Sequence, residues 1–130
     1  MLFICVHNAG RSQMAAGFMR RLGGGRVNVW SSGPDPGDRI NPDAVVAMDE
    51  VGIDISDQIP ALLTEDVVQA SDVVVTIGCA DACPIFPGKL YQDWQVDDPR
   101  GQGIEAMRSI RDQIEQRVRA LLAEVLTDGS

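Results

Sequence analysis

The segment DVVVTIG, residues 72–78, constrains the fold of this chain most, because its apolar residues are continuous rather than alternating with polar ones. A strand of this kind is covered on both faces, as in parallel sheets whose crossover helices pack on either side. Helical patterns precede and follow this segment. The sequence therefore predicts an α/β fold, a three-layer sandwich built around a small parallel sheet.

The remaining elements alternate between strands and helices along the chain. Further strands are expected at residues 2–6, 27–32 and 89–94. Helices are expected at residues 12–22, at 42–51, in a short stretch that starts with Thr64, and at 103–126. Asn41 is a good N-cap for the second helix, and Pro42 suits its first position. This order contains no repeat, linker or low-complexity segment.

Length, composition and charge limit the class of protein. A chain of 130 residues, 45% of them hydrophobic, can bury one core, so we expect a single domain over residues 1–130. No stretch reaches the roughly 18 apolar residues of a membrane span, and the first residues lack a signal-peptide pattern. We therefore expect a cytoplasmic protein that binds no membrane. The net charge of −8 also disfavours nucleic acid as a partner, since nucleic acid is bound mainly through Lys and Arg.

The loop after the first expected strand carries a cysteine and an arginine in the stretch CVHNAGRS, residues 5–12. Ligands of open α/β sheets bind beyond the carboxyl ends of the strands, where loop and helix N–H groups form an anion cradle. The residues expected to form this cradle are Val6, His7, Asn8, Ala9, Gly10, Arg11 and Ser12. Arg11 adds a planar fork that suits two oxygens of a tetrahedral oxyanion. The same positive surroundings favour a Cys5 thiolate at neutral pH.

Two side chains of this loop have expected supporting roles, and the loop has a simpler alternative interpretation. Ser12 could donate a hydrogen bond to the Cys5 thiolate, and Asn8 could hold the loop in shape. In the alternative, Cys5 is a buried core cysteine and Arg11 a solvated residue at a helix start. The strand before the loop and the Arg-Ser pair that opens the helix favour a role for Cys5 as a nucleophile over this alternative.

The stretch CVHNAGRSQMA resembles the phosphate-binding loop of the low-molecular-weight protein tyrosine phosphatase superfamily, in particular of its arsenate reductase branch. SSGPDP, INPDAVVAMDEVGIDIS and DDP resemble the same family in order and approximate spacing, so the resemblance covers nearly the whole chain. It implies a four-stranded parallel sheet flanked by helices, with Cys5 as the nucleophile and Arg11 as the oxyanion binder. It also suggests Asp98 as the general acid.

Displacement of an oxygen from a tetrahedral oxyanion supports a role for such an acid, because it needs a proton donor opposite the attacking sulfur. Asp97 and Asp98 are adjacent candidates, and Pro99 stiffens the chain directly after Asp98. The alternative is a charged turn without a catalytic role.

Cys79 and Cys83 accompany Cys5, which gives the chain three cysteines. In a reducing compartment an odd count points to metal, redox or nucleophilic use rather than to static disulfides. By resemblance to thioredoxin-coupled arsenate reductases, Cys5, Cys79 and Cys83 would form a disulfide relay recycled by thioredoxin. Better-known relatives have a longer segment between the last two thiols. Closing that disulfide here requires Cα atoms within about 4.4–6.8 Å of each other.

The leading functional hypothesis is therefore reduction of arsenate to arsenite, with phosphate or sulfate as competing oxyanions. We expect no cofactor and no metal ion. Ala16 and Pro60 stand where some relatives have acidic potassium ligands, and the lone His7 lines the anion loop rather than contributing to a zinc site.

Three alternatives remain open from the sequence. A phosphatase of the same fold would hydrolyse phosphotyrosine. An arsenite-binding protein would hold the metalloid through three thiolates and catalyse nothing. A third possibility changes only the electron donor: mycothiol, with mycoredoxin, would attack the arsenic adduct on Cys5 directly.

Overall fold

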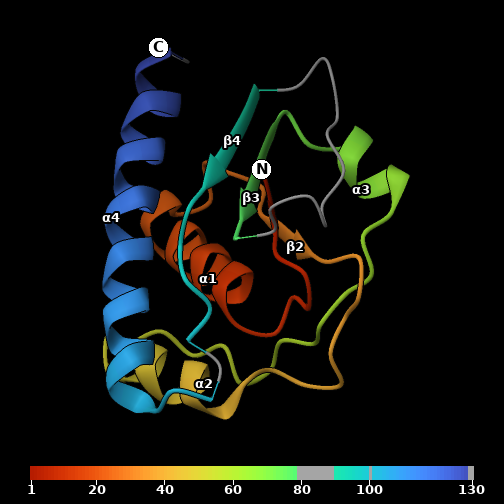
Figure 1. The fold of residues 1–130 in the computed structure, drawn as a ribbon. Helices are drawn as coiled ribbons and strands as arrows, with labels where there is room; N and C mark the ends of the chain where they lie inside the picture. Colours follow the sequence, from red (N-terminus) through yellow and green to blue (C-terminus); the bar gives the residue numbers. More distant parts are fainter. Residues whose placement is uncertain (79–89, 100, 129–130) are drawn as a thin grey trace.

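The computed structural model describes residues 1–78, 90–99 and 101–128 (Figure 1). Its sheet has four parallel strands in the order β2-β1-β3-β4. The strands are β1 (Leu2–Ile4), β2 (Trp30–Ser32), β3 (Val73–Ile77) and β4 (Leu90–Trp94). Phe3 of β1 lies opposite Ser31 on one side and Val75 on the other. The predicted four-stranded parallel sheet is confirmed, with the continuous apolar segment as a central strand.

Two strands are shorter than the apolar pattern predicted. β1 ends at Ile4, because the carbonyl of Val6 already accepts a hydrogen bond from the loop N–H of Asp35 at 3.0 Å. β2 begins at Trp30, although Val27 and Val29 pack against the core before it. The apolar character of Val27 and Val29 thus indicates burial in the core, but not pairing with a neighbouring strand.

Four helices complete the described chain: α1 (Arg11–Gly23), α2 (Pro42–Asp49), α3 (Glu65–Gln69) and α4 (Ile104–Asp128). The Asn41 side chain caps α2 by accepting from the N–H of Asp43 at 2.9 Å, as expected for this residue pattern. Helix α2 ends two residues before the expected position, and Gly52 turns the chain with a φ of +80°. None of the helices in the described ranges is both long and apolar enough to cross a membrane.

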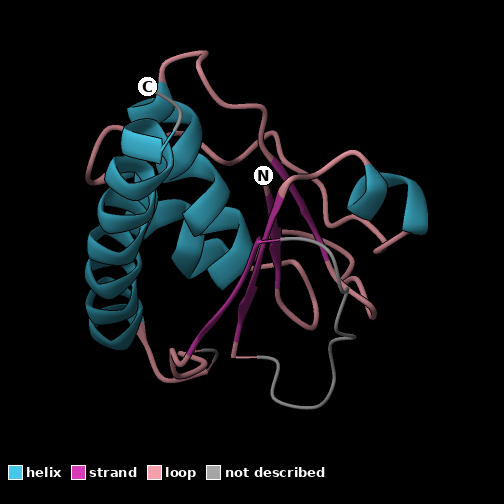
Figure 2. Ribbon diagram, turned by 90° about the horizontal axis from the view of Figure 1, so that it is seen from above, coloured by secondary structure: helices cyan, strands magenta, loops and turns pink. Residues whose placement is uncertain are grey.

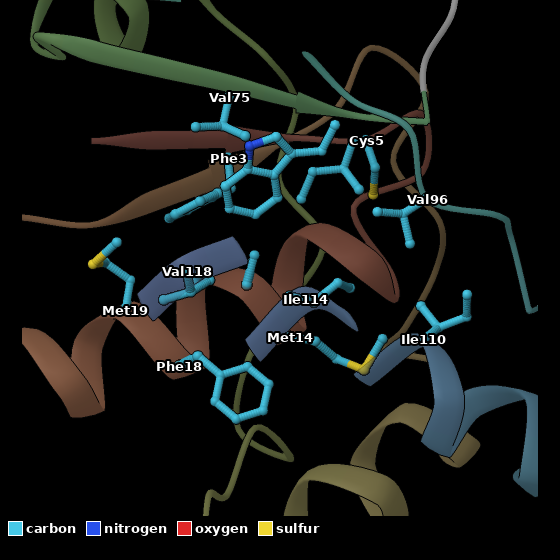
Figure 3. Close-up of a cluster of buried hydrophobic side chains, with 14 of the residues drawn as sticks. Phe3, Cys5, Met14, Phe18, Met19, Val75, Val96, Ile110, Ile114 and Val118 are labelled. Atoms are coloured by element: carbon cyan, nitrogen blue, oxygen red, sulfur yellow. The ribbon is translucent and has the colours of Figure 1, made fainter. Parts of the chain in front are cut away.

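The helices lie on the two faces of the sheet and complete the three layers (Figure 2). On one face, α1, α2 and α4 enclose the main core, whereas the short α3 lies on the other. Alternate residues of β1 point to opposite faces of the sheet. Phe3 points into the main core, whereas Leu2 and Ile4 belong to a smaller hydrophobic cluster on the other face. Figure 3 shows Cys5 and Val96 in this main cluster. The core therefore supports the first strand up to the cysteine that follows it.

Candidate active site

Cys5 lies directly after β1 and is almost fully buried, with 3% of its surface exposed. Its Sγ is 2.9 Å from Oγ of Ser12, in the first turn of α1. Asn8 Nδ2 donates to the same Oγ at 2.7 Å. Because Oγ accepts from Asn8, the single hydroxyl proton of Ser12 is available to the sulfur. The expected contact between Ser12 and Cys5 is present, with a geometry suited to stabilising a thiolate.

Asn8 organises the loop, as expected, through more contacts than the sequence suggested. Its side chain is fully buried, and its backbone has a φ of +49°, a conformation that Asn tolerates better than most residues. Oδ1 accepts from Nε2 of Gln13 and from the backbone N–H of Ala61, both at 2.9 Å. Asn8 thus joins the start of α1 to a segment 53 residues further along the chain.

The carbonyl groups of the loop point away from its interior. Three of them accept from backbone N–H groups in the segment 35–41: Val6 from Asp35 at 3.0 Å, His7 from Gly37 at 2.9 Å and Ala9 from Asn41 at 2.7 Å. The C=O and N–H of a trans peptide point to opposite sides, so the N–H groups that follow these carbonyls point into the loop. None of the backbone–backbone hydrogen bonds found within the described residues has an N–H donor from residues 6–12. The three inward N–H groups are therefore suited to an anion.

Arg11 is the first residue of α1, and its side chain reaches Gly78 after β3 and Val96 after β4. Its side chain is only 10% exposed. Nη1 donates to the carbonyl of Val96 at 2.9 Å, and Nη2 lies 3.8 Å from Oδ2 of Asp98. The carboxylate of Asp98 is 46% exposed. The structure therefore places the arginine beside the aspartate that the sequence singled out.

Two adjoining cavities contain these groups. The inner cavity, of about 60 Å³, is lined by Cys5, His7, Ala9, Gly10, Arg11, Asn41, Asp98, Pro99 and Met107. This volume exceeds the roughly 10–15 Å³ that a cavity needs to hold one water, and such a small cavity suits a compact tetrahedral anion. The outer cavity, of about 420 Å³, is lined by Val6, His7, Arg11, Gly78, Gln95, Val96, Asp97 and Asp98. Asp98 lines both cavities, whereas Asp97 lines only the outer one.

His7 lines the loop, as the sequence indicated. Its Nδ1 is 2.9 Å from the carbonyl oxygen of Asp35 and 3.5 Å from the carboxylate of the same residue. No group of three or more metal-ligating side chains occurs in the part of the chain that the structure describes. Cys79 and Cys83 lie outside the described residues, so the structure brings together Cys5, Arg11 and Asp98 of the predicted catalytic set.

Several supporting residues were missed in the sequence interpretation. Gln13 is a buried polar residue on α1 that donates to both the side chain and the carbonyl of Asn8. Gly33 lies so close to the loop that a Cβ there would come within 2.3 Å of the Cys5 carbonyl oxygen. The carbonyl of Val96 receives Arg11. Of these supporting residues, Gly33 is the one with a signal in the sequence, because a glycine next to a strand can mark a place where another backbone approaches closely.

Comparison with known proteins identifies the family. The family model described as low molecular weight phosphotyrosine protein phosphatase matches residues 1–130. The chain belongs to this family. The resemblance noted in the sequence is therefore confirmed.

Similar proteins within the family carry the name arsenate reductase. The glutaredoxin arsenate reductase of Synechocystis is 38% identical, over 96% of this chain and 97% of that protein. A solved thioredoxin-dependent arsenate reductase from Corynebacterium glutamicum is 41% identical with a TM-score of 0.85; the match covers 98% of this chain but 61% of that one. Another solved arsenate reductase, in a phosphate-binding state, is 38% identical with a TM-score of 0.84 over 95% of each chain.

Proposed function

We propose that this protein reduces arsenate to arsenite, with the Cys5 thiolate as the nucleophile. The observation that carries the proposal is the position of the Cys5 sulfur at a small cavity beside the inward N–H groups of the loop and the Arg11 guanidinium. Those groups suit a tetrahedral oxyanion, for which phosphate and sulfate would compete. The names of the similar proteins favour arsenate as the oxyanion that reacts.

The first step forms a bond between Cys5 and arsenic. The thiolate attacks As(V) and forms the S–As bond, the bond from arsenic to one hydroxyl group of arsenate breaks, and a proton from Asp98 lets that hydroxyl depart as water. The proximity of Asp98 to Arg11, at 3.8 Å, and its place in the lining of the inner cavity support this role. Asp97 lines only the outer cavity and is the weaker candidate.

The second step transfers two electrons to arsenic. In our proposal Cys79 attacks the sulfur of Cys5, so that the Cys5–As bond breaks and its electron pair stays on arsenic, which departs as arsenite. Cys83 then attacks Cys79, which frees Cys5 and leaves a Cys79–Cys83 disulfide. The support for these steps is the presence of both cysteines in the sequence and the arsenate reductase names of the relatives.

Thioredoxin is the electron donor that we propose for this disulfide. A thioredoxin-dependent arsenate reductase is 41% identical to this chain, although this chain spans only 61% of it. There are two alternative electron donors. One is glutaredoxin, after the name of the Synechocystis relative. The other is mycothiol with mycoredoxin, which would attack the arsenic adduct on Cys5 directly. We further propose that the chain works as one domain in the cytoplasm.

Phosphotyrosine hydrolysis is the second candidate, because the description of the family is that of a phosphatase. The nucleophile, the arginine and the acid would serve either reaction. Among the described residues that line the two cavities, however, none is a Phe, Tyr or Trp of the kind that grips a phenyl ring. This lining favours a small inorganic oxyanion.

A donor series on two cysteine variants tests the proposal. With thioredoxin, Cys83→Ser should release about one arsenite per chain and then stall with a Cys5–Cys79 disulfide, which peptide mapping under non-reducing conditions detects. A small thiol should revive it better than thioredoxin does. Cys79→Ser, the matched variant, should release no arsenite with thioredoxin. Multiple turnovers of Cys83→Ser with thioredoxin would exclude the relay, and unchanged turnover with mycothiol would select direct attack on Cys5.

A further inference from the structure

We propose that Gly78 is a positioning residue for Arg11: it leaves open the space that the guanidinium occupies and thereby sets the affinity of the site for oxyanions. The inference rests on the proposed role of Arg11 as the oxyanion binder. Gly78 directly follows β3, which pairs in parallel with β1, so both strands deliver their carboxyl ends to the same edge of the sheet. Cys5 follows β1 at that edge.

The backbone of Gly78 lies unusually close to the arginine. A Cβ at this position would lie 1.7 Å from Nη1 and 2.9 Å from Cζ of Arg11, and 2.8 Å from the carbonyl oxygen of Val96. Real Cβ atoms essentially never approach another heavy atom to less than 3.0 Å. Gly78 also has a φ of +63°, which glycine adopts without steric cost. The backbone contact with Val96 and the positive φ both favour glycine here, and a Cβ would also displace the guanidinium of Arg11.

This close approach determines where the guanidinium can lie. Gly78 N–H donates to the Trp94 carbonyl at 3.0 Å, which fixes the glycine against β4. The Val96 carbonyl, two residues after β4 ends, accepts a hydrogen bond from Nη1 of Arg11. The arginine is thus held between two backbone segments at 10% exposure, and its planar fork has further N–H donors for an anion. A side chain fixed in its binding geometry loses little freedom when the ligand binds.

Substitution of Gly78 should therefore weaken anion binding through the arginine. To restore a separation of 3.0 Å from 1.7 Å, Nη1 would have to move by about 1.3 Å. A displacement of this size breaks charge-assisted hydrogen bonds between the guanidinium and the anion. We expect the dissociation constant for phosphate to rise about 10- to 100-fold in Gly78→Ala.

Phosphate binding to the reduced full-length chain tests the inference without any turnover. Phosphate protection of Cys5 from iodoacetamide, followed by peptide mapping, gives the dissociation constant. Gly52→Ala is the matched control, because Gly52 has a similar φ of +80° but open space where the added methyl group would lie, and it is outside the site. Gly52→Ala should bind phosphate like the wild type.

A double-variant cycle then separates an effect through Arg11 from a general structural effect. In an Arg11→Ala background, Gly78→Ala should weaken phosphate binding by less than about twofold, and it should lower the melting temperature less than it does alone. If Gly78→Ala alone does not fold, recovery of folding in the double variant supports the proposal. Unchanged phosphate affinity in Gly78→Ala, an undiminished loss in the Arg11→Ala background, or a double variant as unstable as Gly78→Ala would each overturn it. Failure of the wild type to bind phosphate would instead refute the proposed function.

Discussion

Ser12→Ala should slow the reaction of Cys5 at neutral pH without removing the nucleophile. The Ser12 hydroxyl is 2.9 Å from Sγ, and when Cys5 is a thiolate only the hydroxyl can donate in this contact, because the thiolate has no proton. A hydrogen bond to a charged group contributes about 1.5–3 kcal/mol, and about 1.4 kcal/mol corresponds to a factor of ten. Loss of this bond should therefore slow the reaction of Cys5 by up to about 10- to 100-fold.

The assay is the rate of Cys5 alkylation by iodoacetamide at pH 7, measured by peptide mapping of the reduced protein. The rate should be lower in Ser12→Ala than in the wild type. Ser32→Ala is the matched control, since Ser32 is also buried and its hydroxyl has no hydrogen-bond partner among the described residues. Wild-type reactivity of Ser12→Ala at pH 7, or equal slowing in both variants, would refute the assigned hydrogen bond.

Three further predictions follow from the described contacts. Asn8→Ala should lower the melting temperature by about 5 °C or more in calorimetry, because buried donors on α1 and in the segment around Ala61 lose their acceptor at about 1–3 kcal/mol each; an unchanged melting temperature would contradict this. Asp98→Asn should lower kcat for arsenate about 100-fold with little change in phosphate affinity, and an equal loss in Asp97→Asn would exclude the assignment. Hydrogen bonds from Arg108 are the main cause that lowers the pKa of Glu50. The ion pair therefore stabilises the fold fully above the ordinary pKa of that carboxyl. This stabilisation is lost as the pH falls through the lowered pKa. The difference in melting temperature between wild type and Glu50→Gln should accordingly vanish in acid, and a difference independent of pH would contradict it.

The fold could be predicted from the sequence because its signals are local. A continuous apolar run at residues 72–78 indicated a strand covered on both faces, and β3 is such a strand. Asn41 before Pro42 indicated a helix start, and α2 begins there. Val27 and Val29 misled only about the length of β2, because they are buried by the core without pairing.

The supporting contacts of the site could not be predicted, because they join residues distant in the sequence. Asn8 accepts from the N–H of Ala61, and Arg11 donates to a carbonyl 85 residues away. No local pattern indicates which backbone group will face a given side chain after folding. The Cys5 and Arg11 spacing was visible because loop and helix start are contiguous.

Arsenite release from the prereduced protein, without any external reductant, tests the central claim most directly. The wild-type chain should convert arsenate to about one arsenite per chain while two thiols per chain disappear, and Cys5→Ser should release none, because a serine hydroxyl there stays protonated and attacks poorly. Arsenite measured by speciation chromatography and thiols counted by mass spectrometry give both quantities in one sample. Release of arsenite by Cys5→Ser, or loss of thiols in the wild type without arsenite, would contradict the account.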